Sequence, residues 1–219
     1  TKTDRDSYEC RHGIGYSRFN GSKNGVNASV LTFVPMNDNC EVSKITLTNN
    51  TDAKKDIQLY SYVEWCLWNA DDDSRNFQRN LSTGEVEVID STIYHKTEYR
   101  ERRNHYAIYS VNTKVDGFDT IRESFIGTYN GADKPEAILN GGCTGSVASG
   151  WAPIAAHQIN VSLNAGESKS FIFVLGYCEN PNEDKWESAG VVNKAPAKEM
   201  LAKYQTEESF DKAFEELRT

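Results

Sequence analysis

A strict alternation of side chains over residues 57–65 constrains the fold of this chain more than any other feature. Ile57, Leu59 and Trp65 fall on one, mostly apolar side of the pattern, and Gln58 and Glu64 fall on the other. A period of two is typical of a β-strand with one buried face. Residues 45–48 alternate in the same way, and the polar residues 49–52 between the two stretches are a turn sequence. The pattern therefore predicts a hairpin over residues 41–65.

Further strand and turn signals run to about residue 180. The sequence of residues 21–25, rich in Gly and Asn, predicts a hairpin turn before a strand over residues 30–34. Residues 159–163 alternate, residues 164–167 form a turn sequence, and residues 171–177 are apolar on both faces, as a central strand would be. Many short strands joined by such turns predict an all-β fold, an antiparallel β-sandwich over residues 1–180.

The character of the chain changes after Pro181. Asn182 is placed to cap a short helix, and Pro196 lies where the first turn of another helix would begin. Thr206 is placed to cap a last helix, whose apolar stripe would contain Phe210, Ala213, Phe214 and Leu217. We therefore expect residues 181–219 to form a short helical linker segment. The stripe needs a surface to cover, either on the sandwich or on another domain.

Composition excludes several partners. The chain of 219 residues has a formal net charge of −8, which argues against nucleic acid because phosphate binding needs a basic face. No apolar run approaches the ~18 residues of a membrane span, so no membrane partner is expected. Five widely spaced cysteines without a CxxC pair indicate free thiols and a cytoplasmic location. A basic cluster, Arg100, Arg102 and Arg103, lies among acidic residues and is expected to form a salt-bridged surface.

The segment of residues 68–80 is the leading candidate for function. It is dense in amide, carboxylate and guanidinium groups, which a sugar site uses because hydroxyl groups need donors and acceptors at fixed positions. A solvated loop held by its own turns is the alternative without function. A calcium loop is disfavoured, because Ser74 stands where a Gly is needed and Asn80 where a bidentate Glu is needed.

Other candidate motifs are weak. His95 and His105 could form a metal pair, but no third ligand or supporting spacing accompanies them, and a charged strand end or interface is favoured. The Gly-rich residues 141–146 lack the Lys of a phosphate-binding loop and indicate a flexible connection. From these residues alone no catalytic residue, metal ligand or resident cofactor is assigned.

Several longer stretches resemble cellobiose phosphorylases, which are inverting glycoside phosphorylases of glycoside hydrolase family 94. The matching stretches cover nearly the whole chain in order: YECRHGIGY (8–16), EWCLWNA (64–70), FQRNLS (77–82), YHKTEYRERR (94–103), SGW (149–151) and VNKAP (192–196). The resemblance implies the N-terminal domain of such an enzyme, a galactose-mutarotase-like super-sandwich that a helical linker joins to an (α/α)₆ catalytic barrel. The chain resembles the later part of the sandwich and the start of the linker, so the opening strands and the barrel are expected to lie outside it.

The resemblance also implies a reaction. Cellobiose and phosphate would give α-glucose 1-phosphate and glucose with inversion, with inorganic phosphate as co-substrate and no cofactor. The acid and the phosphate-binding residues would belong to the barrel, so this chain is expected to be inactive alone as part of a glycosyltransferase-type phosphorylase. Cellobiose is favoured over chitobiose, laminaribiose and cellodextrin. A stand-alone carbohydrate-binding module and an inert structural platform remain alternative functions.

The resemblance implies a role for the polar segment as well. These enzymes resemble homodimers in which the N-terminal domain reaches the partner's active site on its acceptor-sugar side. The residues expected to contact cellobiose or glucose there are Asn69, Asn76, Gln78, Arg79 and Asn80.

Overall fold

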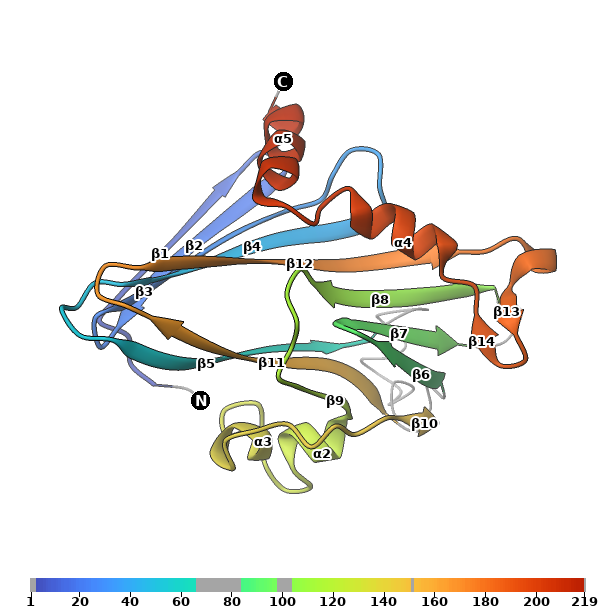
Figure 1. The fold of residues 1–219 in the computed structure, drawn as a ribbon, viewed down its shortest axis with the longest axis horizontal. Coiled ribbons are helices and arrows are strands. Elements are labelled where there is room, and N and C mark those ends of the chain that lie inside the picture. The colour runs from blue at the N-terminus through green and yellow to red at the C-terminus, as the bar shows by residue number, and fades with distance from the viewer. Residues whose placement is uncertain (1–2, 66–83, 98–103, 151, 219) are drawn as a thin grey trace.

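The computed structural model describes residues 3–65, 84–97, 104–150 and 152–218. Its main elements are two antiparallel sheets packed face to face, with helices outside both of them (Figure 1). None of the described helices is long and apolar enough to cross a membrane. The prediction of an all-β, antiparallel sandwich followed by short helices is confirmed.

The larger sheet has nine strands in the order β1-β2-β3-β4-β12-β8-β7-β6-β10. Their bounds are β1 Ser7–Gly13, β2 Tyr16–Lys23, β3 Val26–Phe33, β4 Cys40–Asn49, β6 Gly84–Ile89, β7 Thr92–Thr97, β8 His105–Val111, β10 Ser149–Gly150 and β12 Ser168–Glu179. The smaller sheet has the order β5-β11-β9, with β5 Lys55–Glu64, β9 Gly117–Ile121 and β11 Pro153–Leu163. A two-stranded sheet follows, with β13 Trp186–Ser188 and β14 Val191–Val192.

Two predictions about strands are confirmed. Strands β2 and β3 form the expected hairpin, and Asn24 and Gly25 in its turn have φ of 51° and 76°. This left-handed conformation matches the twist of a two-residue hairpin and is favourable for Asn and Gly. Strand β12 is central, between β4 and β8, and residues 171–174 are buried.

The predicted hairpin over residues 41–65 is wrong. Strand β4 belongs to the larger sheet and β5 to the smaller one, so the chain crosses between the sheets at residues 50–54. The side chain of Asn49, which is fully buried, directs this crossing. Its Nδ2 donates to the carbonyl oxygens of Ala53 (2.7 Å), Leu163 (3.2 Å) and Asn164 (3.0 Å), and its Oδ1 accepts from the Thr51 backbone N–H (3.0 Å). Asn49 thereby links the β4–β5 crossing to the β11–β12 crossing.

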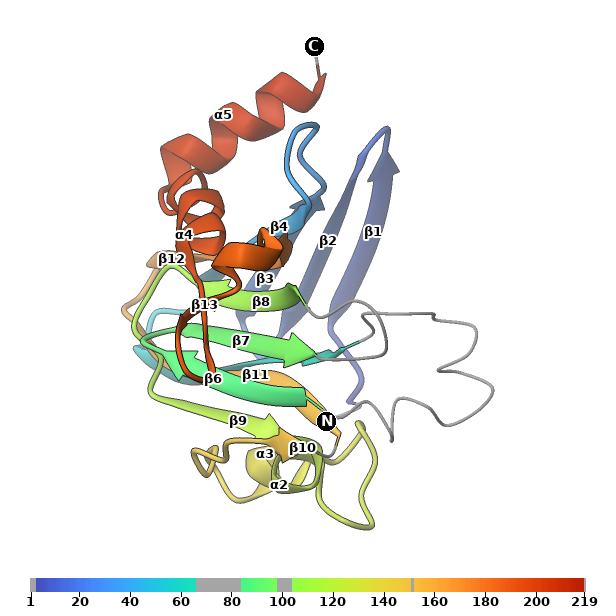
Figure 2. The same ribbon diagram turned by 90° about the vertical axis from the view of Figure 1, so that its right-hand side faces the viewer.

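The larger sheet has one hydrophobic core on each of its two faces. The core between the sheets includes Leu47, Ile93, Tyr109, Leu163 and Phe173. The second core lies on the outer face of the larger sheet, under α4 (Ala195–Ala202) and α5 (Glu207–Arg218), and Figure 2 shows both helices along that face.

The apolar stripe of α5 covers the sandwich. Phe210 and Phe214 are buried against Phe33, with ring centroids 5.1 and 5.5 Å away, and Tyr16 packs edge-on against Phe214 at 5.1 Å. The predicted cap is confirmed, because Thr206 Oγ1 accepts a hydrogen bond from the Ser209 backbone N–H at 3.1 Å. Burial of two Phe side chains makes this helix part of the outer core.

Other helical predictions are met in part. Helix α4 starts one residue before Pro196, which lies in its first turn. Asn182 does not cap a helix: residues Asn182–Asp184 form a single 3₁₀ turn after Pro181, because the chain turns at once into the β13–β14 hairpin. Helices α2 (Arg122–Ile126) and α3 (Glu136–Leu139) cover the outer face of the smaller sheet, α2 through Phe125 and Ile126 and α3 through Ala137.

The Gly-rich stretch of residues 141–146 is anchored to the smaller sheet. Asp119, fully buried on β9, accepts hydrogen bonds from the backbone N–H groups of Thr144 (3.1 Å) and Ser146 (3.0 Å) and from both of their hydroxyl groups (2.6 and 2.7 Å). The expectation of a flexible connection is therefore wrong. A carboxylate with several donors fixes the loop in one conformation.

Candidate functional site

The predicted sugar contacts Asn69, Asn76, Gln78, Arg79 and Asn80 lie outside the described residues. The calcium alternative within the same segment and the basic cluster Arg100, Arg102 and Arg103 also lie outside them. These assignments remain predictions. The structure does show which strands precede and follow the two segments that contain these residues.

Both segments, residues 66–83 and 98–103, connect to the same end of the sandwich. The first follows β5 in the smaller sheet and leads to Gly84 at the start of β6 in the larger one. Gly84 pairs with Thr97, the last residue of β7, after which the second segment begins. The paired ends of β6 and β7 are thus the common base of the two segments, and we call this region the loop-bearing end.

A buried ion-pair network holds the loop-bearing end. The carboxylate of Glu87 on β6 forms ion pairs with Lys194 Nζ at 2.5 Å and with Lys96 Nζ at 3.0 Å. Lys96 Nζ also lies 3.0 Å from the carboxylate of Glu85. The Lys194 side chain is 1% exposed and that of Lys96 is 9% exposed. Because buried charges need partners, the carboxylate of Glu87 fixes both ammonium groups.

The same network joins the β13–β14 hairpin to the larger sheet. Lys96 Nζ donates to the carbonyl oxygen of Gly190 at 2.5 Å, and Glu87 Oε1 accepts from the Val192 backbone N–H at 3.0 Å. Burial alone would raise the pKa of Glu87, but hydrogen bonds from Lys194, Val192 and Lys96 outweigh it, and the pKa lies below its ordinary value. Glu87 is therefore an ionised anchor at neutral pH.

Aromatic and imidazole rings lie buried next to this base. Trp65, the residue after β5, stacks on His95 with ring centroids 5.4 Å apart and an interplanar angle of 19°. Burial, with a contribution from His105, lowers the pKa of His95 to about 4, so the ring is neutral at pH 7. Among the described residues, Trp65 Nε1 and His95 Nδ1 have no hydrogen-bond partner.

The favoured interpretation of the stretch from His95 to His105 is a charged strand end or an interface. His95 lies near the end of β7 and His105 begins β8, but both residues are buried, at 2% and 4% exposed, and His105 stacks on Tyr177 at 5.8 Å, so the two rings are not part of a charged surface. The interface stays a prediction, because residues 98–103 lie outside the described ones. Within the described part of the chain, no group of three His, Cys, Asp or Glu side chains is placed to hold a metal.

One aromatic side chain at this end is partly exposed. Trp186 of β13 is 38% exposed, with Lys185 Nζ 4.3 Å and Lys96 Nζ 5.8 Å from its ring centroid. A tryptophan face beside ammonium and carboxylate groups can contact a ring and its hydroxyl groups. Reasoning from sequence missed Trp186, Glu87 and Lys194. Lys194 lies within the matching stretch of residues 192–196 and Trp186 lies shortly before it, whereas no sequence signal pointed to Glu87.

The described cysteines agree with the expectation of free thiols. Cys10, Cys40, Cys143 and Cys178 are not in disulfides, and Cys40 and Cys178 are buried in the outer core. Burial raises the pKa of the Cys178 thiol to about 11, so it stays protonated and unreactive at neutral pH.

The fold of this chain is similar to that of a solved carbohydrate-active protein. The structure superposes on a solved bacterial glucoamylase complexed with acarbose with a TM-score of 0.54 at 15% identity, covering 81% of this chain and 24% of that one. At this identity the likeness shows the fold alone, a large antiparallel two-sheet sandwich.

The sequence then gives the family. A family model described as "Glycosyl hydrolase 94, supersandwich domain" matches residues 1–207, so the chain belongs to this family. It is similar to an N,N'-diacetylchitobiose phosphorylase of Vibrio furnissii, 27% identical over 96% of this chain and 25% of the relative. It is also similar to a solabiose phosphorylase of Paenibacillus borealis, 26% identical over 80% of this chain and 23% of the relative. The chain thus spans about a quarter of the length of these curated relatives.

Proposed function

We propose that this chain is the N-terminal domain of an inverting disaccharide phosphorylase. The observation that carries this proposal is the family match over residues 1–207, together with relatives named as phosphorylases that extend well beyond the matched region. In the reaction, a carboxylic acid outside this chain protonates the glycosidic oxygen. Phosphate forms a bond to the anomeric carbon as the bond to the leaving glucose breaks, which inverts the configuration.

The substrate we propose is cellobiose, on the basis of the stretches that resemble cellobiose phosphorylases. The name of the Vibrio furnissii relative makes N,N'-diacetylchitobiose the main competitor. These sugars differ at the 2-position, where one carries a hydroxyl group and the other an acetamido group. A site built for one of them would leave polar groups unpaired with the other, so the two activities should differ strongly.

Within that enzyme, the loop-bearing end is proposed to form part of the dimer interface and to carry the acceptor-side residues to the partner's active site. Asn69, Asn76 and Gln78 would contact the acceptor glucose, with Arg79 and Asn80 behind them. Support comes from the base of the segment: a rigid, ion-paired scaffold at Glu87, Lys96 and Lys194 suits a segment that must be held in one position.

The test is a phosphorolysis assay with the full-length protein. With cellobiose and phosphate, proton NMR should show α-glucose 1-phosphate appearing with an equal amount of glucose. N,N'-diacetylchitobiose should be turned over at least about 100-fold more slowly. Faster turnover of N,N'-diacetylchitobiose would move the substrate assignment to that sugar, and no phosphorolysis of any β-linked disaccharide would contradict the proposed function.

A further inference from the structure

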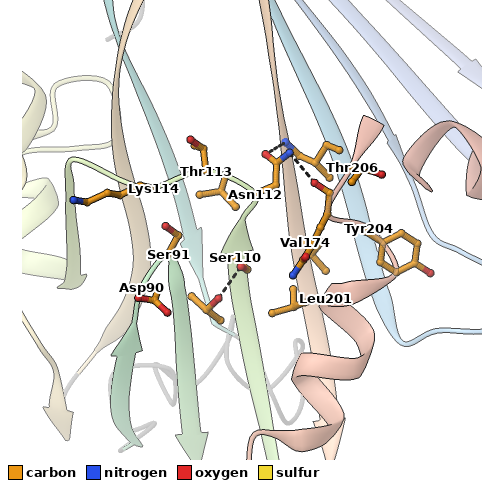
Figure 3. A pocket seen from close by; sticks show the side chains of 14 residues that line it. Asp90, Ser91, Ser110, Asn112, Thr113, Lys114, Val174, Leu201, Tyr204 and Thr206 are labelled. Carbon is orange, nitrogen blue, oxygen red and sulfur yellow. Dashed lines mark hydrogen bonds between the residues drawn. The ribbon is translucent and has the colours of Figure 1, made fainter. Parts of the chain in front are cut away.

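A pocket lies on the outer face of the larger sheet, between the sheet and the turn that joins α4 to α5. It has a volume of about 480 Å³, which is within the range of ligand sites (Figure 3). Asp90 and Ser91 of the β6–β7 turn line it, as does Asn112 just after β8. These residues are at the opposite end of β6, β7 and β8 from the loop-bearing end, so the pocket is separate from the site proposed above.

Hydroxyl groups line the floor of this pocket. The hydroxyls of Thr92 and Ser110 are 2.7 Å apart, and each residue is 8% exposed. Ser91 Oγ accepts a hydrogen bond from the Val115 backbone N–H at 3.2 Å, which leaves its own proton available for donation. Such groups can both donate and accept, as a ligand with several hydroxyl groups requires.

An apolar strip runs beside these hydroxyls. Ile172 and Val174 of β12 and Leu201 of α4 line the pocket and are buried. The charged groups at the rim are Asp90 and Lys114, one of each sign. The lining therefore does not select for an anion or a cation. Hydroxyls next to an apolar strip with balanced charge match a sugar ring, which has C–H faces and hydroxyl edges.

The wall formed by the α4–α5 turn is fixed to the sheet through Asn112. Its Oδ1 accepts from the Ile172 backbone N–H at 2.8 Å, and its Nδ2 donates to the carbonyl oxygen of Gln205 at 3.2 Å (Figure 3). A ligand in the pocket would contact the sheet on one side and the helical segment on the other. Binding would therefore also hold the C-terminal helices on the sheet.

We propose that this pocket binds a neutral saccharide, of one or two hexose rings, and that the bound sugar stabilises the docking of α4 and α5. The site is additional to the acceptor site and does not depend on it. Sugar binding and the docking of α4 and α5 on the sheet are therefore thermodynamically coupled, so that each favours the other.

Calorimetric titration of the complete protein with glucose and with cellobiose tests this proposal. At least one sugar should bind saturably at this pocket, and hydrogen exchange in α5 should slow as the pocket fills. Ser110→Ala, which removes one floor hydroxyl, should weaken that binding about tenfold. Thr113→Ala at the rim should act in the same direction and serves if Ser110→Ala does not fold. Ser170→Ala is the matched control, because Ser170 bonds Thr46 at 3.0 Å in a similar hydroxyl pair and does not line the pocket.

Two results would overturn the proposal. One is the absence of saturable binding of either sugar. The other is sugar binding that Ser110→Ala and Thr113→Ala leave unchanged. A protein carrying Asn69→Ala and Asn76→Ala should keep this binding. If it loses all sugar binding, the sugar occupies the acceptor site alone and the pocket proposal fails while the proposed function stands.

Discussion

Lys194 Nζ lies 2.5 Å from Glu87 Oε2, and this contact fixes the start of α4 to strand β6. Lys194 is 1% exposed, so its charge has lost nearly all contact with water. The carboxylate is shared with Lys96, which makes Glu87 the centre of the network. Removal of the Glu87 charge would leave the buried ammonium groups of Lys96 and Lys194 without this partner.

Glu87→Gln should therefore lower the free energy of unfolding by about 3 kcal/mol, the typical cost of a buried charge left without its partner. Urea unfolding followed by circular dichroism measures this change. The matched control is Glu85→Gln, because Glu85 contacts the same Lys96 but its side chain is 65% exposed, and its loss should cost less than about 1 kcal/mol. Equal losses in the two variants would show that the network does not depend on Glu87.

Buried histidines should make the fold sensitive to acid. Burial lowers the pKa of His157 to about 4, and its ring stacks on Tyr109 at 5.2 Å. The unfolded chain takes up a proton on this ring below about pH 6.5, whereas the folded chain does not until about pH 4. Stability is therefore lost as pH falls from about 6.5 to about 4, by up to about 3 kcal/mol for this ring.

His157→Phe keeps an aromatic ring and removes the titrating group. Its free energy of unfolding should fall less steeply with pH between 6.5 and 4 than that of the parent protein. Urea unfolding at several pH values gives both slopes. Parallel slopes would mean that His157 is not protonated on unfolding. Glu87 contributes separately, because its lowered pKa adds stability above about pH 4.5 that is lost on further acidification.

Asn49→Ala should destabilise the fold strongly, although it changes only one polar side chain. Asn49 holds backbone groups of both crossings between the sheets, and the variant leaves the buried carbonyl oxygen of Leu163 without this donor. We expect a loss of about 2–4 kcal/mol in urea unfolding. Asn50→Ala, at the exposed neighbouring position, should stay within about 0.5 kcal/mol of the parent. A small effect at both positions would refute the role of Asn49.

Helix α5 should depend on its two buried rings. Phe210→Ala removes a side chain that is fully buried against Phe33 and should cost about 3–5 kcal/mol. Hydrogen exchange should then accelerate in α5 before it does in β12. Lys212→Ala on the exposed side of the same helix is the control, and equal exchange in both variants would contradict the packing described.

The sequence predicted which residues form strands better than which strands pair. Alternation shows that one face of residues 57–65 is buried, and that face is indeed covered by the larger sheet. The same pattern does not tell whether the neighbour is β4 or β11, because either one satisfies it. The choice depends on the hydrogen bonds of Asn49 with Leu163, a residue 114 positions away in the chain. Such a long-range contact has no local signature.

The candidate site shows the same limit. The polar composition of residues 68–80 points to a sugar, but their position lies outside the described residues. The ion-pair network of Glu87, Lys96 and Lys194 was not predicted. A lysine such as Lys194 is normally exposed, and its burial depends on Glu87 from a distant part of the sequence. The helical stripe of residues 210–217 was predicted well, since it is local and periodic.

The most direct test of the account is the reverse reaction of the complete enzyme with glucose 1-phosphate and glucose. In the protein carrying Asn69→Ala and Asn76→Ala, the KM for glucose should rise about tenfold or more, while the KM for glucose 1-phosphate stays unchanged. Asn130→Ala, at an exposed position in the connection between α2 and α3, is the control and should match the parent. Unchanged acceptor kinetics in the double variant would contradict the claim that this domain completes the acceptor site.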